Sequence, residues 1–509
     1  MQTNVLEYLE QTVLKVPEKL AFVDEKEQLT FRQLYDGSRA IGSYLIKKNI
    51  YKEPVLVFMK KSVRTIQAFL GIIYGGGLYV PVDADMPEAR IKLIMEKTKA
   101  KFILCDEENK ARIQSLQFDG EAFVVTDLVH SRIDCDLIDN IKKQVVDTDP
   151  LYILFTSGST GMPKGVIGHH RAVIDYTDHI SEALGVGEHN IFGNQSPLHF
   201  DGCMKDIYPT LKYGATTYFI PKHLFSFPVD LIKYLNENKI NSICWVASAF
   251  ALVSSLGTLE NIVPKYVHTV AFGSEVLPVK QFNIWRKTLK NARFINTYGP
   301  TETTGVSCYY EVDRFYEENE TIPIGYPFKN TGVFLVKEDG KKAQIGEEGE
   351  IYIRGSGVTH GYYDNEEKTK EVFVQNPLNS HYQEIVYRTG DIGKFDEKGR
   401  LYFISRKDYQ IKHMGYRIEL GEIDSNLFQM DGVYDACSIY SKLDEKIVMY
   451  YTGTVTKSEV IKYLKEKVPR YMVPNIVLQL EQMPLLPNGK KNRSALEQMY
   501  MDYKKEKRR

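Results

Sequence analysis

Cysteine is sparse in this chain of 509 residues, and its distribution excludes two common stabilising devices. No two cysteines form a C-x-x-C pair, so the sequence predicts neither a disulfide framework nor a zinc site. This usage fits a reducing cytosol, and we expect a cytoplasmic protein. The six cysteines are Cys105, Cys135, Cys203, Cys244, Cys308 and Cys437.

An excess of either charge is also lacking. Lys and Arg together number 65 and Asp and Glu 66, so no net field attracts the whole protein to nucleic acid or to an anionic membrane. The basic run at 504–509 is open to two interpretations, a nucleic-acid or lipid patch and a solvated helix end, and we favour the second. We therefore expect no nucleic-acid and no membrane partner, and any bound anion must be met by local groups.

Long apolar runs are absent too. Nowhere do about 18 apolar residues follow one another, and the N-terminal segment has no basic stretch followed by an apolar one. The sequence thus predicts a soluble, unexported protein. With 43% hydrophobic and 26% charged residues, the composition is that of a globular enzyme, and its length predicts two or more packed units.

Strand-like apolar runs alternate with helical patterns along the first 300 residues. The first clear helix follows a capping box at Thr30 to Gln33, with Leu34, Ile41 and Leu45 at helical spacing. The alternation predicts two mostly parallel sheets covered by helices. The strand-like runs lie at 54–59, 78–82, 102–105, 151–155, 191–195, 216–220, 242–246 and 267–272.

The pattern changes in the last 190 residues. Short alternating strands between about 322 and 403 predict an antiparallel sheet or small barrel, and a compact α+β segment follows 406–408. The predicted fold is therefore α/β, with a large N-terminal domain at 1–406, made of two βα sheet subdomains plus a small β-barrel, and a small α+β domain at 407–509.

The segment 156–165, TSGSTGMPKG, directly follows a buried-looking strand. Its glycines let backbone N–H groups converge, its hydroxyls add donors and its lysine adds a cation, so the segment suits a polyphosphate. It differs from a Walker A loop, because proline precedes the lysine and glycine follows it. A flexible connector is the alternative on composition alone. The candidate phosphate ligands are Thr156, Ser157, Gly158, Ser159, Thr160, Gly161 and Lys164.

Further motifs give the chain a family resemblance. NTYGPTE at 296–302, YRTGD at 387–391, RKD at 406–408 with GYR at 415–417, and NGK at 488–490 follow the phosphate loop in this order. The set resembles the adenylate-forming superfamily, which includes nonribosomal peptide synthetase adenylation domains, D-alanine–carrier protein ligases, acyl-CoA synthetases and luciferases. The resemblance covers essentially the whole chain and implies a mobile C-terminal domain and two half-reactions at one site.

The resemblance implies roles for the motif residues. Lys490 resembles the catalytic lysine that bridges carboxylate and α-phosphate, and Glu302 with Thr156 resembles the Mg²⁺ ligands of ATP. Asp408 resembles the hinge, and Gly415 the small residue beside the pantetheine arm. The nucleotide set beyond the phosphate loop is Asn296, Thr297, Tyr298, Gly299, Thr301, Glu302, Asp391, Phe403 and Arg406, with Asp391 on the ribose and Tyr298 over adenine.

Phe200-Asp201 resembles the motif whose aspartate pairs with the α-ammonium group of an amino acid. A buried carboxylate needs such a cation, although capping by an Asp before Gly202 is the alternative. The resemblance places the substrate pocket at Asp201, Gly202, Lys205, Cys244, Val270, Phe272, Thr297, Gly305, Val306 and the catalytic Lys490.

Lys205 is the unusual member of this pocket. A cation there predicts an acidic or strongly hydrogen-bonding substrate side chain, with glutamate and aspartate as the leading candidates. Pairing with Asp206, or extension of the ammonium group to solvent, are equally open alternatives.

We therefore expect an ATP-dependent enzyme that makes an aminoacyl-adenylate and passes the acyl group to a phosphopantetheinyl carrier protein in trans, since only some twenty residues follow Lys490. The stretch at 273–278 is similar to D-alanine–carrier protein ligases, which makes D-alanine the second candidate substrate. An acyl-CoA synthetase and a nonenzymatic adenylate-binding protein are the remaining alternatives. Asn492 departs from the family's usual aspartate and alters the turn after Lys490.

Overall fold

The computed structural model describes residues 2–158, 162–485 and 491–507. The chain divides into two compact units, the first formed by Met1–Ala84, Thr98–Phe155 and Gly165–Lys407. The second unit contains Asp85–Lys97, Thr156–Lys164 and Asp408–Arg509. The division after Lys407 lies one residue from the expected boundary, but the phosphate loop and most of a helix also belong to the second unit.

A nine-stranded sheet dominates the first unit. Its six central strands are parallel, and antiparallel strands close both edges. The strands, in spatial order, are β15 (Tyr326–Pro327), β14 (Cys308–Glu311), β13 (Arg293–Tyr298), β12 (Thr269–Gly273), β11 (Ser242–Val246), β9 (Ile191–Asn194), β10 (Thr216–Phe219), β1 (Leu20–Val23) and β2 (Gln28–Thr30).

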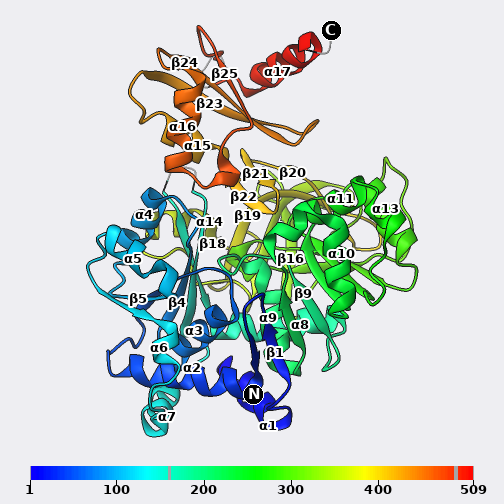
Figure 1. The fold of residues 1–509 in the computed structure, drawn as a ribbon. Helices are drawn as coiled ribbons and strands as arrows, with labels where there is room; N and C mark the ends of the chain where they lie inside the picture. The colour runs from blue at the N-terminus through cyan, green and yellow to red at the C-terminus, as the bar shows by residue number, and fades with distance from the viewer. Residues whose placement is uncertain (1, 159–161, 486–490, 508–509) are drawn as a thin grey trace. The chain divides into compact units, whose positions relative to one another are not determined.

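Helices cover both faces of this sheet. In Figure 1 the green helices α10, α11 and α13 lie on the outer face, where Trp245, Phe250 and Trp285 form a buried aromatic cluster. The opposite face packs against α8 and α9. The helices near this sheet are α8 (His170–Leu184), α9 (Met204–Tyr213), α10 (Pro228–Glu237), α11 (Ala247–Ser255), α12 (Thr258–Asn261) and α13 (Val279–Thr288), with short turns η1 (Asp201–Cys203), η2 (Lys222–Ser226) and η3 (Thr301–Thr303).

A second sheet of six strands comes from the chain between β2 and β9. Its spatial order is β6 (Glu121–Val124), β5 (Phe102–Cys105), β3 (Pro54–Met59), β4 (Leu78–Asp83), β7 (Pro150–Thr156) and β8 (Lys164–His169). The predicted capping box is present at the start of α2, where Thr30 and Gln33 exchange side-chain and backbone hydrogen bonds. The accompanying helices are α1 (Leu6–Lys15), α2 (Phe31–Ile46), α3 (Val63–Tyr74), α5 (Glu107–Ser115), α6 (Val125–Leu128) and α7 (Cys135–Gln144).

The predicted antiparallel region forms a five-stranded sheet. Its strands follow the order β16 (Thr331–Val336), β17 (Glu348–Gly355), β19 (Ile385–Phe395) and β18 (Phe373–Gln375). The fifth strand, β20 (Leu401–Arg406), also pairs with β19. The short helix α14 (Glu366–Val372) leads into β18. The sheet has two open edges, so it is a curled half-barrel rather than a closed barrel.

The second unit has its own core. The hairpin of β21 (Gln410–His413) and β22 (Tyr416–Glu419) turns at Met414 and Gly415, both with positive φ, and leads into α15 (Leu420–Leu427). A three-stranded sheet follows, made of β23 (Val433–Ser441), β24 (Lys446–Gly453) and β25 (Ile476–Gln479). Its helices are α4 (Glu88–Thr98), α16 (Lys457–Lys467), η4 (Arg470–Met472) and α17 (Arg493–Lys507).

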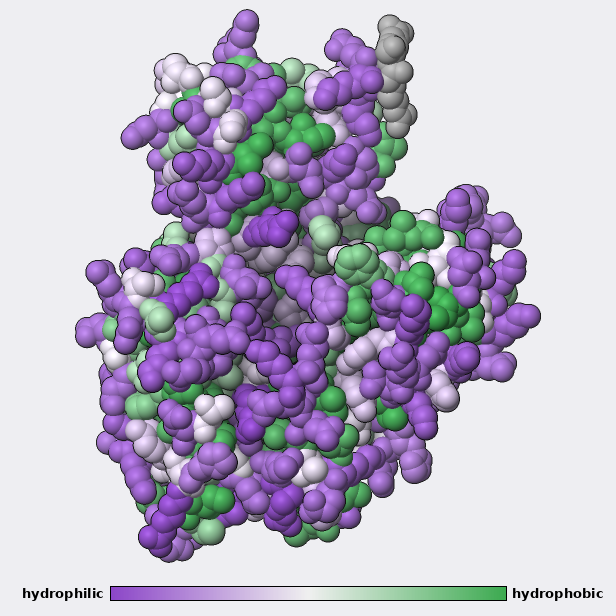
Figure 2. Space-filling view, in the orientation of Figure 1, coloured by the Kyte–Doolittle hydropathy of each residue, from purple (hydrophilic) through white to green (hydrophobic). Residues whose placement is uncertain are grey.

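The predicted α/β architecture, with two βα sheets, an antiparallel sheet and a small α+β region, is confirmed. Hydrophilic residues cover most of the face shown in Figure 2, in keeping with the balanced composition. Within the described ranges, no helix combines the length and apolar character that crossing a bilayer requires.

Candidate functional site

Asp391, the predicted ribose ligand, is held from two sides in the first unit. The hydroxyl of Tyr298 donates to Oδ2 of Asp391 at 2.6 Å, and Nη1 of Arg406 donates to Oδ1 at 2.6 Å. Arg406 reaches Asp391 because the two residues are directly opposite in the β19–β20 pair. Burial raises the pKa of the Tyr298 phenol well above its ordinary value, and the negative charge of Asp391 raises it further. Tyr298 therefore stays a neutral hydrogen-bond donor to Asp391.

Three other predicted nucleotide residues lie in the same region. The amide of Asn296 donates to the carbonyl of Pro323 at 2.8 Å, and Phe403 packs with Tyr298 in one apolar cluster. At Gly299 a Cβ atom would lie 2.6 Å from the backbone nitrogen of Ser307, so only glycine allows this close approach. The contacts fix the backbone around Tyr298 but do not test its predicted stacking on adenine.

Glu302, the predicted Mg²⁺ ligand, is fully buried on η3. The hydroxyl of Tyr362 donates to Oε1 of Glu302 at 2.6 Å, a contact that no sequence motif indicates. Among the described residues no group of three His, Cys, Asp or Glu side chains could hold a metal by itself. Glu302 and Thr156 offer hard oxygen donors, which fit an ion held mainly by ATP phosphates.

The described part of the phosphate loop, 156–158 and 162–165, contacts the hairpin and α15 of the second unit. Ser157 donates to the carbonyl of Arg417 at 2.7 Å, and Lys164 forms an ion pair with Glu419 at 3.3 Å. The N–H of Gly158 donates to Oε2 of Glu422 at 2.9 Å. The Gly158 N–H is thus occupied by a carboxylate oxygen in this structure. Ser159, Thr160 and Gly161 lie outside the described residues.

Glu422 has a second partner in the same unit. It forms a buried ion pair with Arg90 of α4. Burial raises the pKa of the Glu422 carboxyl, and the charge of Arg90 and the Gly158 N–H act in the opposite direction. The carboxylate is thus satisfied by a cation and a backbone donor.

Lys490 lies outside the described residues, but the segment after it is anchored. Arg493 forms an ion pair with Asp424 at 2.6 Å and donates to the carbonyl of Ser438 at 3.1 Å. The side-chain oxygen of Asn492 accepts a hydrogen bond from the N–H of Ala495 at 3.1 Å. Asn492, where the family usually has aspartate, therefore supplies a side-chain cap to the start of α17.

Asp201, the predicted partner of an α-ammonium group, opens η1 and is partly exposed. The hydroxyl of Thr301 donates to its Oδ2 at 2.6 Å. A Cβ atom on Gly305 would lie 3.5 Å from Cβ of Asp201, so the structure brings these two predicted pocket residues together. Thr301, the hydrogen-bond donor to Asp201, is adjacent to Glu302 on η3. The predicted ligand of the amine, Asp201, is therefore connected through this short turn to the predicted metal ligand, Glu302.

The sheet register separates the other predicted pocket residues. Cys244 pairs with Ala271, and Gly273 with Thr297, so these side chains share the face of the nine-stranded sheet that packs on α9. Val270 and Phe272 alternate with them and are buried on the opposite face, beside Trp245. The structure thus corrects the assignment of Val270 and Phe272 to a pocket shared with Cys244, because the predicted positions were one residue out of phase.

Lys205 is only 7% exposed on α9. Within the described part of the chain it makes no hydrogen bond and no ion pair, not even with its neighbour Asp206. Lys205 therefore forms no direct ion pair with Asp206, although its charge opposes the burial that raises the pKa of that carboxyl group. Extension of the ammonium group toward solvent stays an alternative, because its nitrogen is not one of the fully buried polar atoms that lack a hydrogen-bond partner. A cation on this largely buried side chain, without a direct ion pair, could bind an anionic group of a ligand.

Asp206 lies in the same surroundings as Lys205, since the charges of both residues act on the buried thiol of Cys244. It accepts a hydrogen bond from the amide of Asn194 at 2.6 Å, and its other oxygen has no hydrogen-bond partner within the described ranges. Burial raises the pKa of Asp206 to about 6, opposed by the Asn194 hydrogen bond and by the charges of Lys205 and Lys61. This carboxyl group is therefore destabilising when ionised.

An Asp206→Asn variant tests this charge. The folded-state pKa lies above the ordinary value of 3.8, so the wild-type protein loses stability as pH rises from about 4 to about 6. Asparagine can keep the Asn194 contact but does not titrate. We expect the variant to gain about 3 kcal/mol relative to wild type across that window, measured by denaturant unfolding at pH 4 and pH 7. A difference that stays constant with pH would contradict the raised pKa.

Tyr176 is a pocket residue that the sequence did not reveal. Its buried phenol has no hydrogen-bond partner in the described part of the chain. Burial raises the pKa of Tyr176 well above its ordinary value, and the nearby charge of Asp201 raises it further. Tyr176 comes from α8, more than twenty residues before Asp201, so no local motif marks it.

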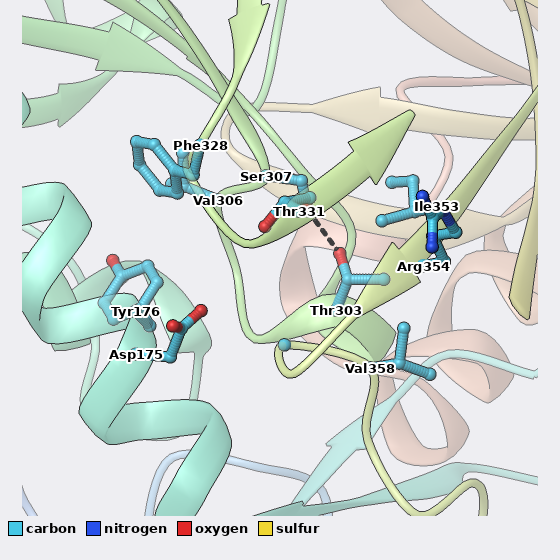
Figure 3. Close-up of a pocket in the computed structure, with 11 residues that line it drawn as sticks. Asp175, Tyr176, Thr303, Val306, Ser307, Phe328, Thr331, Ile353, Arg354 and Val358 are labelled. Carbon is cyan, nitrogen blue, oxygen red and sulfur yellow. Dashed lines mark hydrogen bonds between the residues drawn. The ribbon is translucent and has the colours of Figure 1, made fainter. Parts of the chain in front are cut away.

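Figure 3 shows the pocket beside Tyr176, a small cavity of about 10 Å³. Tyr176 faces Val306 and Phe328, and the hydroxyls of Thr303 and Ser307 are joined by a hydrogen bond at 2.7 Å across the pocket. Val306, predicted to line the substrate pocket, therefore borders a real cavity together with Tyr176.

Comparison with known proteins identifies the chain's relatives. The family model described as "AMP-binding enzyme" matches residues 9–363. Tyrocidine synthase 1 of Brevibacillus parabrevis is 29% identical over 97% of this chain and 45% of its own length. Bacitracin synthase 1 of Bacillus licheniformis is 32% identical over 96% of this chain and 9% of its own length. The chain thus spans less than half the length of these curated relatives.

Solved structures share the fold. The Vibrio cholerae adenylation domain AlmE, crystallised in complex with glycyl-adenosine-5'-phosphate, superposes with a TM-score of 0.84. It is 19% identical in sequence, and the match covers 99% of this chain and 98% of AlmE. The similarity extends over both units of the chain.

Proposed function

Because the chain belongs to the AMP-binding enzyme family, we propose that it activates an amino acid as an aminoacyl-adenylate. In the first half-reaction a carboxylate oxygen attacks the α-phosphorus of ATP, and the bond to the bridging oxygen of pyrophosphate breaks. In the second, a phosphopantetheine thiolate of a separate carrier protein attacks the acyl carbon and AMP leaves. The homology to nonribosomal peptide synthetase adenylation domains supports this sequence of steps.

Each part of ATP is assigned to particular residues of the chain. Asp391 and Arg406 bind the ribose, and the N–H groups of the loop at 156–165 bind the phosphates. Glu302 and Thr156 hold the Mg²⁺ ion, which neutralises phosphate charge when it is bound. Lys490 stabilises the charge that develops between the carboxylate and the α-phosphate.

The substrate amine is the proposed partner of Asp201. Thr301 occupies one oxygen of this carboxylate, which fixes its orientation. An ammonium group at the other oxygen would be recognised by charge and geometry together. AlmE, which was crystallised with a glycyl-adenylate, supports an amino acid as the acyl donor.

The substrate side chain is proposed to be acidic, glutamate or aspartate. The observation that carries this is the largely buried side chain of Lys205, whose ammonium group makes no hydrogen bond or ion pair with the described residues. A substrate carboxylate would supply the missing anion, and the phenol of Tyr176 could donate a further hydrogen bond. D-Alanine, the second candidate, has no side-chain group that would satisfy Lys205.

A Lys205→Met variant tests the acidic pocket. Methionine keeps most of the length of the side chain but removes the cation, so we expect the kcat/KM for glutamate or aspartate to fall about a hundredfold relative to that for glutamine or methionine. The measurement is amino-acid-dependent ATP–pyrophosphate exchange. An unchanged substrate profile would remove Lys205 from the pocket.

The wider test is a pyrophosphate-exchange screen of the wild-type protein with L- and D-amino acids, hydroxy acids and aryl acids. Preference for L-glutamate or L-aspartate would support the proposal, and preference for D-alanine would favour the second candidate. Equal transfer to CoA and to a phosphopantetheinyl carrier would favour an acyl-CoA synthetase. ATP binding without exchange for any acid would indicate a nonenzymatic adenylate-binding protein.

A further inference from the structure

The segment 359–363 is braced against the strand that follows the phosphate loop. The N–H of His360 donates to the carbonyl of Ile167, and the N–H of Ile167 donates to the carbonyl of Gly361, both at 3.0 Å. The N–H of Tyr363 donates to the carbonyl of Gly165 at 2.7 Å. These three backbone bonds fix residue 362 relative to β8.

The same segment holds Glu302 by two bonds. The N–H of Thr359 donates to the Glu302 carbonyl at 3.0 Å, and the phenol of Tyr362 donates to Glu302 Oε1 at 2.6 Å. Both side chains of the Tyr362–Glu302 pair are buried, and the Tyr362 ring packs edge-on against Phe373. The phenol therefore has a defined position, set by packing as well as by the backbone.

We propose that Tyr362 is a positioning residue for the metal-binding carboxylate of Glu302, an inference that rests on the proposed role of Glu302 toward Mg²⁺. By holding Oε1, the phenol sets the direction in which the rest of the carboxylate faces. The phenol is a neutral donor, so it places no positive charge beside the carboxylate, unlike a lysine or arginine in the same place.

The expected loss of metal affinity on removal of the Tyr362 hydroxyl can be estimated from other metal sites. Loss of a group that hydrogen-bonds a metal ligand typically weakens metal affinity or activity about 10- to 100-fold. A residue that acts through Glu302 should change the metal requirement and leave recognition of the amino acid untouched. These two readouts separate positioning from a general loss of structure.

The experiment uses Tyr362→Phe, which removes the hydroxyl but keeps the ring against Phe373. The probe is Mn²⁺, whose binding to the enzyme–ATP complex is followed by electron paramagnetic resonance, together with the Mg²⁺ dependence of pyrophosphate exchange. We expect the Mn²⁺ dissociation constant to rise at least about tenfold, with the KM for the amino acid unchanged.

Two controls isolate the hydrogen bond. Tyr363→Phe removes the neighbouring phenol, whose contact is the carbonyl of Thr98 at 3.4 Å, and should bind Mn²⁺ like wild type. Phe373→Leu loosens the packing of Tyr362 but keeps its hydroxyl. If Phe373→Leu weakened Mn²⁺ binding as much as Tyr362→Phe, packing would explain the effect and the proposal would be wrong.

Glu302→Gln separates this inference from the proposed function. If Glu302→Gln leaves Mn²⁺ binding unchanged, the proposed metal role of Glu302 fails, and the role of Tyr362 fails with it. If Glu302→Gln weakens binding and Tyr362→Phe does not, only the positioning role is overturned. Weakening by both variants, with a smaller effect for Tyr362→Phe, is the result that supports the inference.

Discussion

A Lys490→Ala variant is expected to lose amino-acid-dependent pyrophosphate exchange by about a thousandfold. A cation about 4 Å from a developing negative charge contributes roughly 4 kcal/mol at an effective dielectric constant near 20. Since each 1.4 kcal/mol is a factor of ten in rate, its loss accounts for nearly three orders of magnitude. Transfer from a chemically supplied aminoacyl-adenylate to the carrier thiol should survive, because that step no longer involves the triphosphate.

The neighbouring lysine provides a matched control for this prediction. Lys491 pairs with Asp435 at 2.8 Å and donates to the backbone of Ala436, contacts that belong to the core of the second unit. Lys491→Ala should therefore keep near wild-type exchange. Exchange by Lys490→Ala at a rate close to wild type would mean that another group carries the first half-reaction.

A Gly158→Ala variant should reduce pyrophosphate exchange nearly as much as Lys490→Ala, and it should do so by displacing the loop backbone rather than by removing a charge. A Cβ atom on this residue would lie 2.0 Å from the carbonyl oxygen of Met162, so the loop must move to admit a single methyl group. The movement would misdirect the Gly158 N–H, the donor that the structure shows bound to a carboxylate oxygen. Loss of one aligned donor typically costs about a hundredfold or more in rate, and we expect kcat/KM for ATP to fall by at least that factor.

Gly187→Ala is the control, because no atom lies within 4 Å of the Cβ that it would introduce. Steady-state exchange at varied ATP concentration compares the two variants, and circular dichroism confirms that both are folded. Equal ATP kinetics in Gly158→Ala and Gly187→Ala would show that the loop tolerates displacement, and with it that the loop does not bind the phosphates tightly.

Contiguous features of this protein could be predicted because local chemistry determines them. The capping box at Thr30 depends on residues three positions apart, and the glycine-rich loop at 156–165 combines backbone freedom with hydroxyl donors in one stretch. The alternation of strand and helix predicted the fold class for the same reason. None of these required knowledge of which distant residues would meet.

Features that depend on strand register or on contacts between distant residues were harder to predict from the sequence. A shift of one residue along β12 moves every side chain to the other face, which explains why Val270 and Phe272 lie in the outer core while Ala271 and Gly273 face the side of Cys244. Tyr362 meets Glu302 across 60 residues of sequence, and nothing in either motif indicates that contact.

Partner contacts also decided between alternatives that the sequence left open. Lys205 precedes Asp206, so a local ion pair is a reasonable alternative, but the structure shows none and gives Asp206 the amide of Asn194 as its hydrogen-bond donor. Asn492 looked like a departure that alters a turn, and its amide oxygen instead caps α17. In both cases the deciding information was the direction of a side chain rather than its identity.

The arrangement around Asp391 has a consequence for how a nucleotide enters. Both oxygens of this carboxylate already have donors, Tyr298 and Arg406. A ribose that binds Asp391 does so by exchange, with each sugar hydroxyl substituting for or sharing a donor that is already in place. The resting enzyme consequently carries no uncompensated anion at this position, and the carboxylate is aligned before ATP arrives, so that little conformational freedom remains to be lost when the sugar binds.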